Sequence, residues 1–167
     1  NIWLNKSTDK TYVNIDNLNA CASSGPVTLA GGETSNVITG GKDTSSLWGG
    51  IGEVSDTLIG GSGQDHFFFG STEGNDFISD FDTQQDTIEF YTDDISKITV
   101  DGSNVHLEAG SDSLTVAYAA GKTMSIAYQD GKLYTAWIGK NEAATKAYDS
   151  SINYYQGSAN NTTTLTV

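Results

Sequence analysis

The chain has 167 residues, enough for one domain with a buried core, and carries a formal net charge of −13. It contains eight lysines and no arginine, so the basic patches and arginine forks that bind nucleic acid are missing. The single Cys21 excludes an internal disulfide and a multi-cysteine zinc site, and no apolar run approaches the roughly 20 residues that span a membrane.

The N-terminal segment, residues 1–30, predicts short strands without metal ligands. The whole chain has 19 glycines and one proline beside many Tyr, Thr, Ser and Asn residues, a composition that favours strands and turns. NIWL at residues 1–4 is typical of a strand, and four later apolar residues have the spacing of inward-facing positions: Ile15, Leu18, Val27 and Leu29. We therefore expect this segment to extend the β coil formed by the repeats that follow.

Repeats with a period of nine residues organise the next segment. Four blocks begin with Gly-Gly and end in a short apolar strand: GGETSNVIT (31–39), GGKDTSSLW (40–48), GGIGEVSDTLI (49–59) and GGSGQDHFF (60–68). Two degenerate copies follow, EGNDFISDF (73–81) and TQQDTIEFY (83–91). Between residues 33 and 94 the chain has thirteen acidic residues and one lysine, so almost all of its charge excess lies in these repeats.

These blocks resemble the RTX nonapeptide, Gly-Gly-x-Gly-x-Asp-x-apolar-x, and GNDFISDFDTQQDTIEF resembles the closing segment of RTX rolls in secreted bacterial proteins. The resemblance implies a parallel β-roll that binds Ca²⁺ and folds when calcium is present. Two physical reasons favour such a roll independently of the resemblance. Glycine supplies the positive φ of tight stacked turns, and carbonyls with carboxylates supply the oxygens that calcium prefers. Phe67 and Phe69 are expected to point inward, with His66 or Phe68 outward.

Turns two repeats apart should stack on the same edge of such a coil. This rule places Asp65 opposite the turn of Asp86, and Asp56 opposite the turn of Asp76, which gives two candidate calcium sites. The expected co-ligands are the carbonyls of four turn glycines, Gly61, Gly63, Gly50 and Gly52. The resemblance to the closing segment adds the carboxylates of Asp80 and Asp82. The first two blocks carry Asn36 and Ser45 instead of aspartate, so side-chain hydrogen bonds should replace the metal there. The alternative is a metal-free solenoid with exposed aspartate turns.

Downstream of residue 91 the pattern changes. Residues 92–139 alternate apolar and polar side chains around Asp-Gly and Gly-Lys turns, which predicts antiparallel hairpins that cap the roll. Residues 140–155 predict a short helix, and TTTLTV at 162–167 predicts a final strand. The expected organisation is a β-solenoid over 1–91, with ligand-bearing repeats at 49–91, a hairpin cap over 92–139 and a short helix, loop and strand over 140–167.

Nothing in the sequence indicates catalysis. His66 and His106 are the only histidines, they lie in no catalytic motif, and the recurring carboxylates are explained by the repeat. Three tryptophans could stack on sugars, although core and rim packing is the favoured explanation for such aromatic residues: Trp3, Trp48 and Trp137. We therefore expect no enzyme activity from this chain.

The sequence thus predicts an all-β, non-catalytic, calcium-binding structural module of a secreted or surface-exposed bacterial protein, such as an adhesin, a coat or an extracellular filament. If the terminal strands of neighbouring copies pair, the module assembles head to tail; otherwise the last strand is an edge within one copy. Two alternatives remain open, namely the C-terminal secretion and folding module of an exported enzyme, and a carbohydrate-binding module that contacts a glycan or host-surface ligand.

Overall fold

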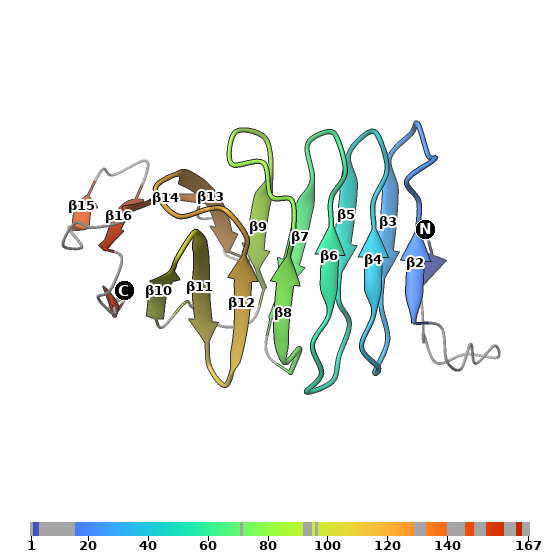
Figure 1. Ribbon diagram of the computed structural model, residues 1–167, viewed down its shortest axis with the longest axis horizontal. Coiled ribbons are helices and arrows are strands. Elements are labelled where there is room, and N and C mark those ends of the chain that lie inside the picture. Colours follow the sequence, from blue (N-terminus) through green and yellow to red (C-terminus); the bar gives the residue numbers. More distant parts are fainter. Residues whose placement is uncertain are drawn as a thin grey trace.

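The computed structural model describes residues 2–3, 16–70, 72–91, 95, 97–128, 133–139, 146–148, 153–158 and 163–164. All regular structure in these ranges is β, and the strands form two sheets that face each other (Figure 1). The all-β prediction is confirmed. Nowhere in the described ranges is there a helix long and apolar enough to cross a membrane.

The described strands divide into a nine-stranded and an eight-stranded sheet. The first runs in the order β1 (Ile2–Trp3), β3 (Val27–Ala30), β5 (Ser45–Trp48), β7 (His66–Phe69), β9 (Thr87–Phe90), β13 (Thr123–Tyr128), β14 (Leu133–Gly139), β16 (Asn153–Ser158) and β15 (Lys146–Tyr148). The second runs in the order β17 (Thr163–Thr164), β10 (Lys97–Asp101), β11 (Asn104–Ala109), β12 (Asp112–Val116), β8 (Asn75–Ile78), β6 (Thr57–Ile59), β4 (Val37–Thr39) and β2 (Asn17–Asn19).

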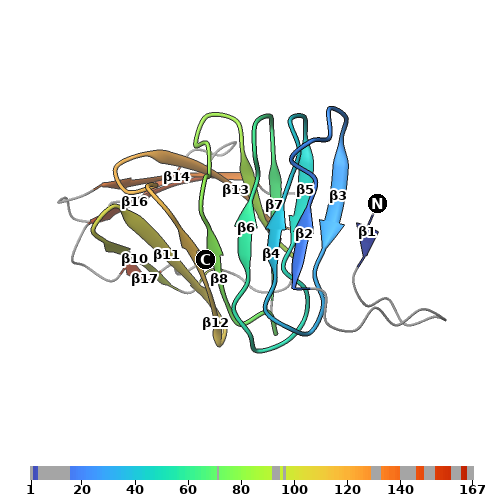
Figure 2. The ribbon, with the colours of Figure 1, turned by 45° about the vertical axis from the view of Figure 1, so that its right-hand side comes forward.

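Strands β2 to β9 form a parallel solenoid. Even-numbered strands lie in one sheet and odd-numbered strands in the other, so the chain crosses between the sheets after every strand (Figures 1 and 2). Each strand pairs with the strand two positions along the chain, and all of these pairs are parallel. The nonapeptide repeat therefore supplies one turn and one strand, and two repeats make one coil. This confirms the predicted parallel β-solenoid.

The core lies between the two sheets and follows the register of the repeats. Leu47, Phe67 and Ile88 stack in one sheet, and Ile38, Leu58 and Ile78 stack opposite them as the second inner row. Phe67 and Phe69 are buried, whereas His66 and Phe68 are half-buried on the outer face, as predicted. Leu18 and Leu29 also join the core, as expected of the N-terminal extension, while Ile15 lies outside the described residues.

Antiparallel hairpins continue both sheets beyond the solenoid. β10, β11 and β12 pair antiparallel and join the eight-stranded sheet where β12 pairs with β8. β13 and β14 form a second antiparallel pair, which joins the nine-stranded sheet through β9. The predicted hairpins are confirmed, and the inward residues of β10 to β13 belong to the same core as the solenoid. They therefore cover one open end of the coil.

The helix predicted over residues 140–155 is wrong for the described residues of that range. Lys146–Tyr148 forms β15, and Asn153–Ser158 forms β16, which pairs parallel with β14 and antiparallel with β15. Tyrosine favours strands, and the edge of β14 offers a hydrogen-bonding partner that an isolated helix lacks. At the C-terminal end, β17 pairs with β10 as an edge strand (Figure 2).

Candidate functional site

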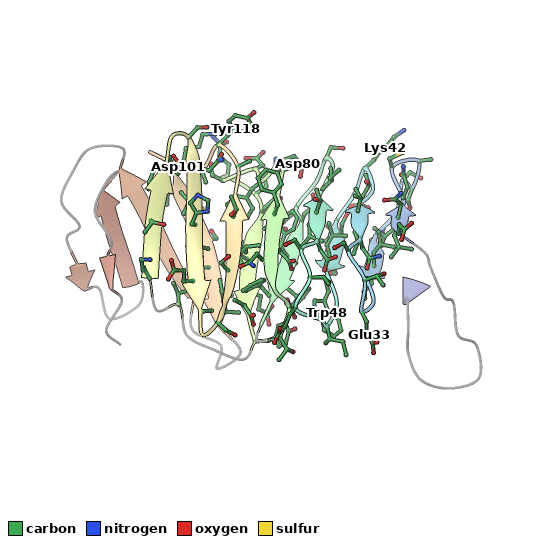
Figure 3. The ribbon with its side chains drawn as sticks, turned by 60° about the horizontal axis from the view of Figure 1, so that its bottom comes forward. Glu33, Lys42, Trp48, Asp80, Asp101 and Tyr118 are labelled. Atoms are coloured by element: carbon green, nitrogen blue, oxygen red, sulfur yellow. The ribbon has the colours of Figure 1, made fainter. Side chains whose placement is uncertain are left out.

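The turns of the solenoid stack along two edges. The first edge contains the turns at 31–36, 49–56 and 72–74, and the second contains those at 40–44, 60–65 and 79–86. Figure 3 shows Glu33 and Trp48 along one edge and Lys42 and Asp80 along the opposite edge. Turns two repeats apart therefore lie on the same edge, as the stacking rule predicted.

Two of the predicted ligand glycines show how closely these turns stack. Gly61 has a φ of 102°, and a Cβ there would lie 2.2 Å from the carbonyl oxygen of Gly41 in the preceding coil. Gly50 has a φ of 121°, and its Cβ would lie 2.3 Å from the carbonyl oxygen of Gly32. No side chain fits at either position, and only glycine adopts such a φ without strain. Gly52 and Gly63 lie in the same two turns, also at positive φ.

Asn36, Asp56 and Asp76 form a buried column on the first edge, which we call the first-edge column. Asp56 accepts the backbone N–H of Asn36 through Oδ1 at 2.6 Å, and Asp76 accepts the N–H of Asp56 in the same way at 2.9 Å. All three side chains are at most 3% exposed. The predicted Asp56 and Asp76 pair therefore lies together.

Ser45, Asp65 and Asp86 form the equivalent second-edge column. Asp65 accepts the N–H of Ser45 through Oδ1 at 2.7 Å, and Asp86 accepts the N–H of Asp65 at 2.9 Å. These side chains are also buried. The second predicted pair lies together as well, so each carboxylate fastens one coil to the next through a charge-assisted hydrogen bond.

The remaining carboxylate oxygens distinguish the two columns. In the second, Asp86 Oδ2 accepts the N–H of Asp82 at 2.8 Å. In the first, Asp76 Oδ2 is buried and has no hydrogen-bond partner. Asp76 Oδ2 and Asp56 Oδ2 both border the space beside Gly49. A Cβ built on Gly49 would lie 2.9 Å from Asp76 Oδ2 and 2.6 Å from Asp56 Oδ2. Two carboxylates thus face the same small space, and one oxygen there is unsatisfied.

Glu73 and Asp112 extend this acidic group, and neither was among the site residues predicted from the sequence. Glu73 is fully buried; its Oε1 accepts the Trp48 indole N–H at 2.5 Å, while its Oε2 has no partner. Asp112 comes from β12 of the hairpin region and accepts the N–H of Thr72. Neither residue occupies the aspartate position of the repeat, so the period could not identify them. The only sequence signal was the excess of acidic residues around Glu73.

Burial makes these carboxyl groups hold protons unusually tightly. The pKa of Asp76 and of Glu73 is raised to about 8, chiefly by desolvation and in part by neighbouring carboxylates, Asp112 among them, while hydrogen bonds offset some of the rise. Desolvation also raises the pKa of Asp56 and of Asp86 to about 6, partly offset by backbone hydrogen bonds, and raises that of Asp65. Near neutral pH the first edge therefore needs protons or a cation to neutralise it.

Asp80 and Asp82, the two further predicted ligands, cap turns of the second edge. The oxygens of Asp80 accept the N–H groups of Gly60 and Gly61 at 2.8 and 3.0 Å. Asp82 accepts the N–H of Gln84 at 3.0 Å and the side-chain amide of Gln85 at 2.8 Å, which lowers its pKa. Both side chains stay at the surface, so these carboxylates are solvated as well as hydrogen-bonded.

Asn36 and Ser45 make the side-chain hydrogen bonds expected of the two blocks without aspartate. Asn36 Oδ1 accepts the N–H of Gly32 at 2.9 Å, and Ser45 Oγ accepts the N–H of Gly41 at 3.0 Å. In each case a neutral side chain closes its own turn four residues back.

The donors available at the edges are all oxygens, which suits a hard cation such as Ca²⁺. Among the described residues, no three Asp, Glu, His or Cys side chains are arranged to hold a metal ion. A calcium ion between Asp56 and Asp76 would therefore need backbone carbonyls or water to complete its shell, as expected of a site with turn glycines. The unsatisfied Asp76 Oδ2 makes the first edge a better fit than the second.

Comparison with models of known protein families finds no match for this chain, and comparison with curated proteins finds no relative. The similarity to RTX nonapeptides therefore rests on the repeats themselves, and the function must be inferred from the geometry of the two edges.

Proposed function

We propose that this chain is a non-catalytic, calcium-binding structural module of a secreted bacterial surface protein. The observation that carries the proposal is the buried Asp76 Oδ2, which lies without a donor beside the carboxylate of Asp56. No described residue forms a salt bridge with either aspartate. A buried charge without a partner costs several kcal/mol, on the order of the stability of a domain, and a divalent cation would remove that cost.

Calcium is the cation favoured by the chemistry and by the proposed location. It accepts six to eight oxygen ligands in flexible geometry, which suits two carboxylates completed by carbonyls and water. Extracellular modules bind calcium with affinities on the order of 10⁻⁴ to 10⁻³ M. Low calcium inside the producing cell would leave the acidic repeats unfolded, and calcium outside would stabilise the fold by mass action.

The open ends of both sheets support a role in an extended surface assembly. In the strand order of the two sheets, β1 and β2 are the outermost strands at one end, and β15 and β17 are the outermost strands at the other; Figure 1 labels β2 and β15 near these opposite ends. Edge strands pair readily with other strands. If one end pairs with the other end of the next copy and the rotation between copies does not close a ring, the copies build a filament, adhesin stalk or coat.

The proposal is tested by calcium titration of the whole chain, followed by circular dichroism and by thermal unfolding. Starting in chelator at pH 7.5, millimolar calcium should raise the unfolding midpoint by about 5 °C or more, whereas equal magnesium should do less. Asp76→Asn should remove most of the calcium effect, because it removes one of the two facing carboxylates. The matched control Asp101→Asn changes an exposed aspartate of the hairpin region and should respond as the unaltered chain does.

An unfolding midpoint that is the same in chelator and in calcium would overturn the calcium role and leave a metal-free solenoid. Light scattering of the same samples tests the assembly separately. Particles of one chain's mass with and without calcium would exclude head-to-tail association.

A further inference from the structure

We propose that the outer face of the nine-stranded sheet carries a binding site for an organic cation of the trimethylammonium type. The site is a cavity of about 370 Å³ over β3, β5 and β7. Three aromatic side chains line it, Trp48, Phe68 and Tyr91, beside Ala30 and the hydroxyl-bearing Thr28 and Ser46. Its volume lies within the range of small-ligand sites, and the inference does not depend on calcium binding.

The three aromatic side chains lie together on one side of the sheet. The rings of Trp48 and Tyr91 are nearly perpendicular, at 86°, with centroids 6.0 Å apart. Phe68 lies next to Trp48 in the parallel register of β5 and β7. The contact between Trp48 and Tyr91 is edge-to-face, which holds the two rings in place at the cavity, and an aromatic face that lines a cavity attracts a quaternary ammonium group placed over it.

Trp48 is held in place from behind. Its indole N–H donates to the buried carboxyl of Glu73, as described above for the first edge. This hydrogen bond fixes the orientation of the Trp48 ring in the wall of the cavity. The wall is therefore preorganised before any ligand arrives.

Charge complementarity favours a cation over other ligands. Glu89 lies beside Phe68 in the register of β7 and β9, and its side chain is half-buried on the same face. The repeats between residues 33 and 94 contain thirteen acidic residues and one lysine, so the field at this face repels anions. A sugar is a poorer fit, because Thr28, Ser46 and Tyr91 are the only lining side chains with a hydroxyl, and most of the wall is carbon.

The test compares choline with its neutral isostere 3,3-dimethylbutan-1-ol, by calorimetry and tryptophan fluorescence, on the whole chain with calcium present. Choline should bind roughly tenfold more tightly than the isostere, since the two differ only in charge at the branched end. Glu89→Gln should weaken choline roughly threefold and leave the isostere unchanged. Trp48→Phe keeps a ring in the wall, and should weaken choline and abolish the fluorescence change.

Equal affinity for choline and its isostere would reduce the cavity to an apolar pocket and overturn the inference, as would no binding of either. Tyr118→Phe, on the exposed hairpin turn, serves as the control and should leave choline binding unchanged. Phosphocholine distinguishes the source of the ligand. If phosphocholine binds as tightly as choline, the site is assigned to headgroups on lipids or polymers. If phosphocholine does not bind while choline does, the site is assigned to a free cation. Either result supports the cation site.

Discussion

The two edges of the solenoid are built from the same repeat but are completed differently. On the second edge, the column ends at Asp86, whose two oxygens accept the N–H groups of Asp65 and Asp82. On the first edge, the column ends at Asp76, which accepts one N–H and keeps one buried oxygen without a donor. A repeat therefore specifies how carboxylates stack, and the residues that follow it decide whether the last carboxylate is satisfied.

The pH dependence of the metal-free protein should show the largest difference between the edges. A carboxyl group whose pKa is higher in the folded than in the unfolded chain stabilises the fold below its unfolded pKa, near 4, and this contribution is lost as the pH rises through the folded pKa. In chelator, stability should therefore fall between about pH 4 and 6 because of Asp86 and Asp56, and on to about pH 8 because of Asp76 and Glu73.

The total loss should be on the order of several kcal/mol, measured by urea unfolding at pH 5, 6.5 and 8. Asp76→Asn should reduce the fall in the free energy of unfolding above pH 6, and Asp86→Asn should reduce only the fall below pH 6. Stability that rises from pH 5 to 8 in chelator would contradict the assignment of buried, proton-holding carboxyls to the first edge.

Backbone stacking, in contrast, should be equally strict on both edges. A Cβ on Gly31 of the first edge would lie 1.8 Å from the carbonyl oxygen of Gly49, and one on Gly40 of the second edge would lie 2.2 Å from that of Gly60. Gly31→Ala and Gly40→Ala should each destabilise the fold by about 3 kcal/mol, because backbone atoms must move. Gly25→Ala meets no atom within 4 Å and should cost less than about 0.5 kcal/mol. A tolerated alanine at Gly31 would show that its coils can separate.

Asparagine substitutions at the two column ends should have opposite signs in chelator at pH 8. Asp86→Asn replaces one of two accepting oxygens with an N–H₂ group, so an N–H donor loses its partner at a cost of about 1–3 kcal/mol. Asp76→Asn keeps an oxygen for the N–H of Asp56, removes a buried charge and places donors beside Asp56 Oδ2, so stability should rise by about 1 kcal/mol. Urea unfolding measures both, and destabilisation by both variants would show that the edges are equivalent.

The sequence allowed the solenoid and its columns to be predicted because both follow from one period. The nine-residue spacing placed Phe67 and Phe69 inward, and the alternation of turns paired Asp56 with Asp76 and Asp65 with Asp86. These are local consequences of a repeated backbone, in which each coil copies the geometry of the one before.

The errors and omissions arose where the repeat ends. The helix expected near Lys146 rested on local propensity, and pairing of the strand Asn153–Ser158 with β14 overrides it. Glu73 and Asp112 were missed because the contact between Thr72 and Asp112 joins residues 40 positions apart, across the junction of solenoid and hairpins. Nor could spacing reveal that Asp76 keeps an unsatisfied oxygen, since this depends on which donors the neighbouring segments supply.

Successive coils of the solenoid are evenly spaced, so a longer solenoid would carry its charge at regular intervals along each edge. Every further coil that carried aspartate would add one carboxylate to each edge, about 4.8 Å from the last, the distance between neighbouring strands. The charge per unit length of each edge would therefore stay constant as the solenoid grew, as it does along a polyelectrolyte rod. Counterions would then condense in proportion to the number of coils. Ion uptake by each edge would then be an extensive property, set by how many repeats a chain contains.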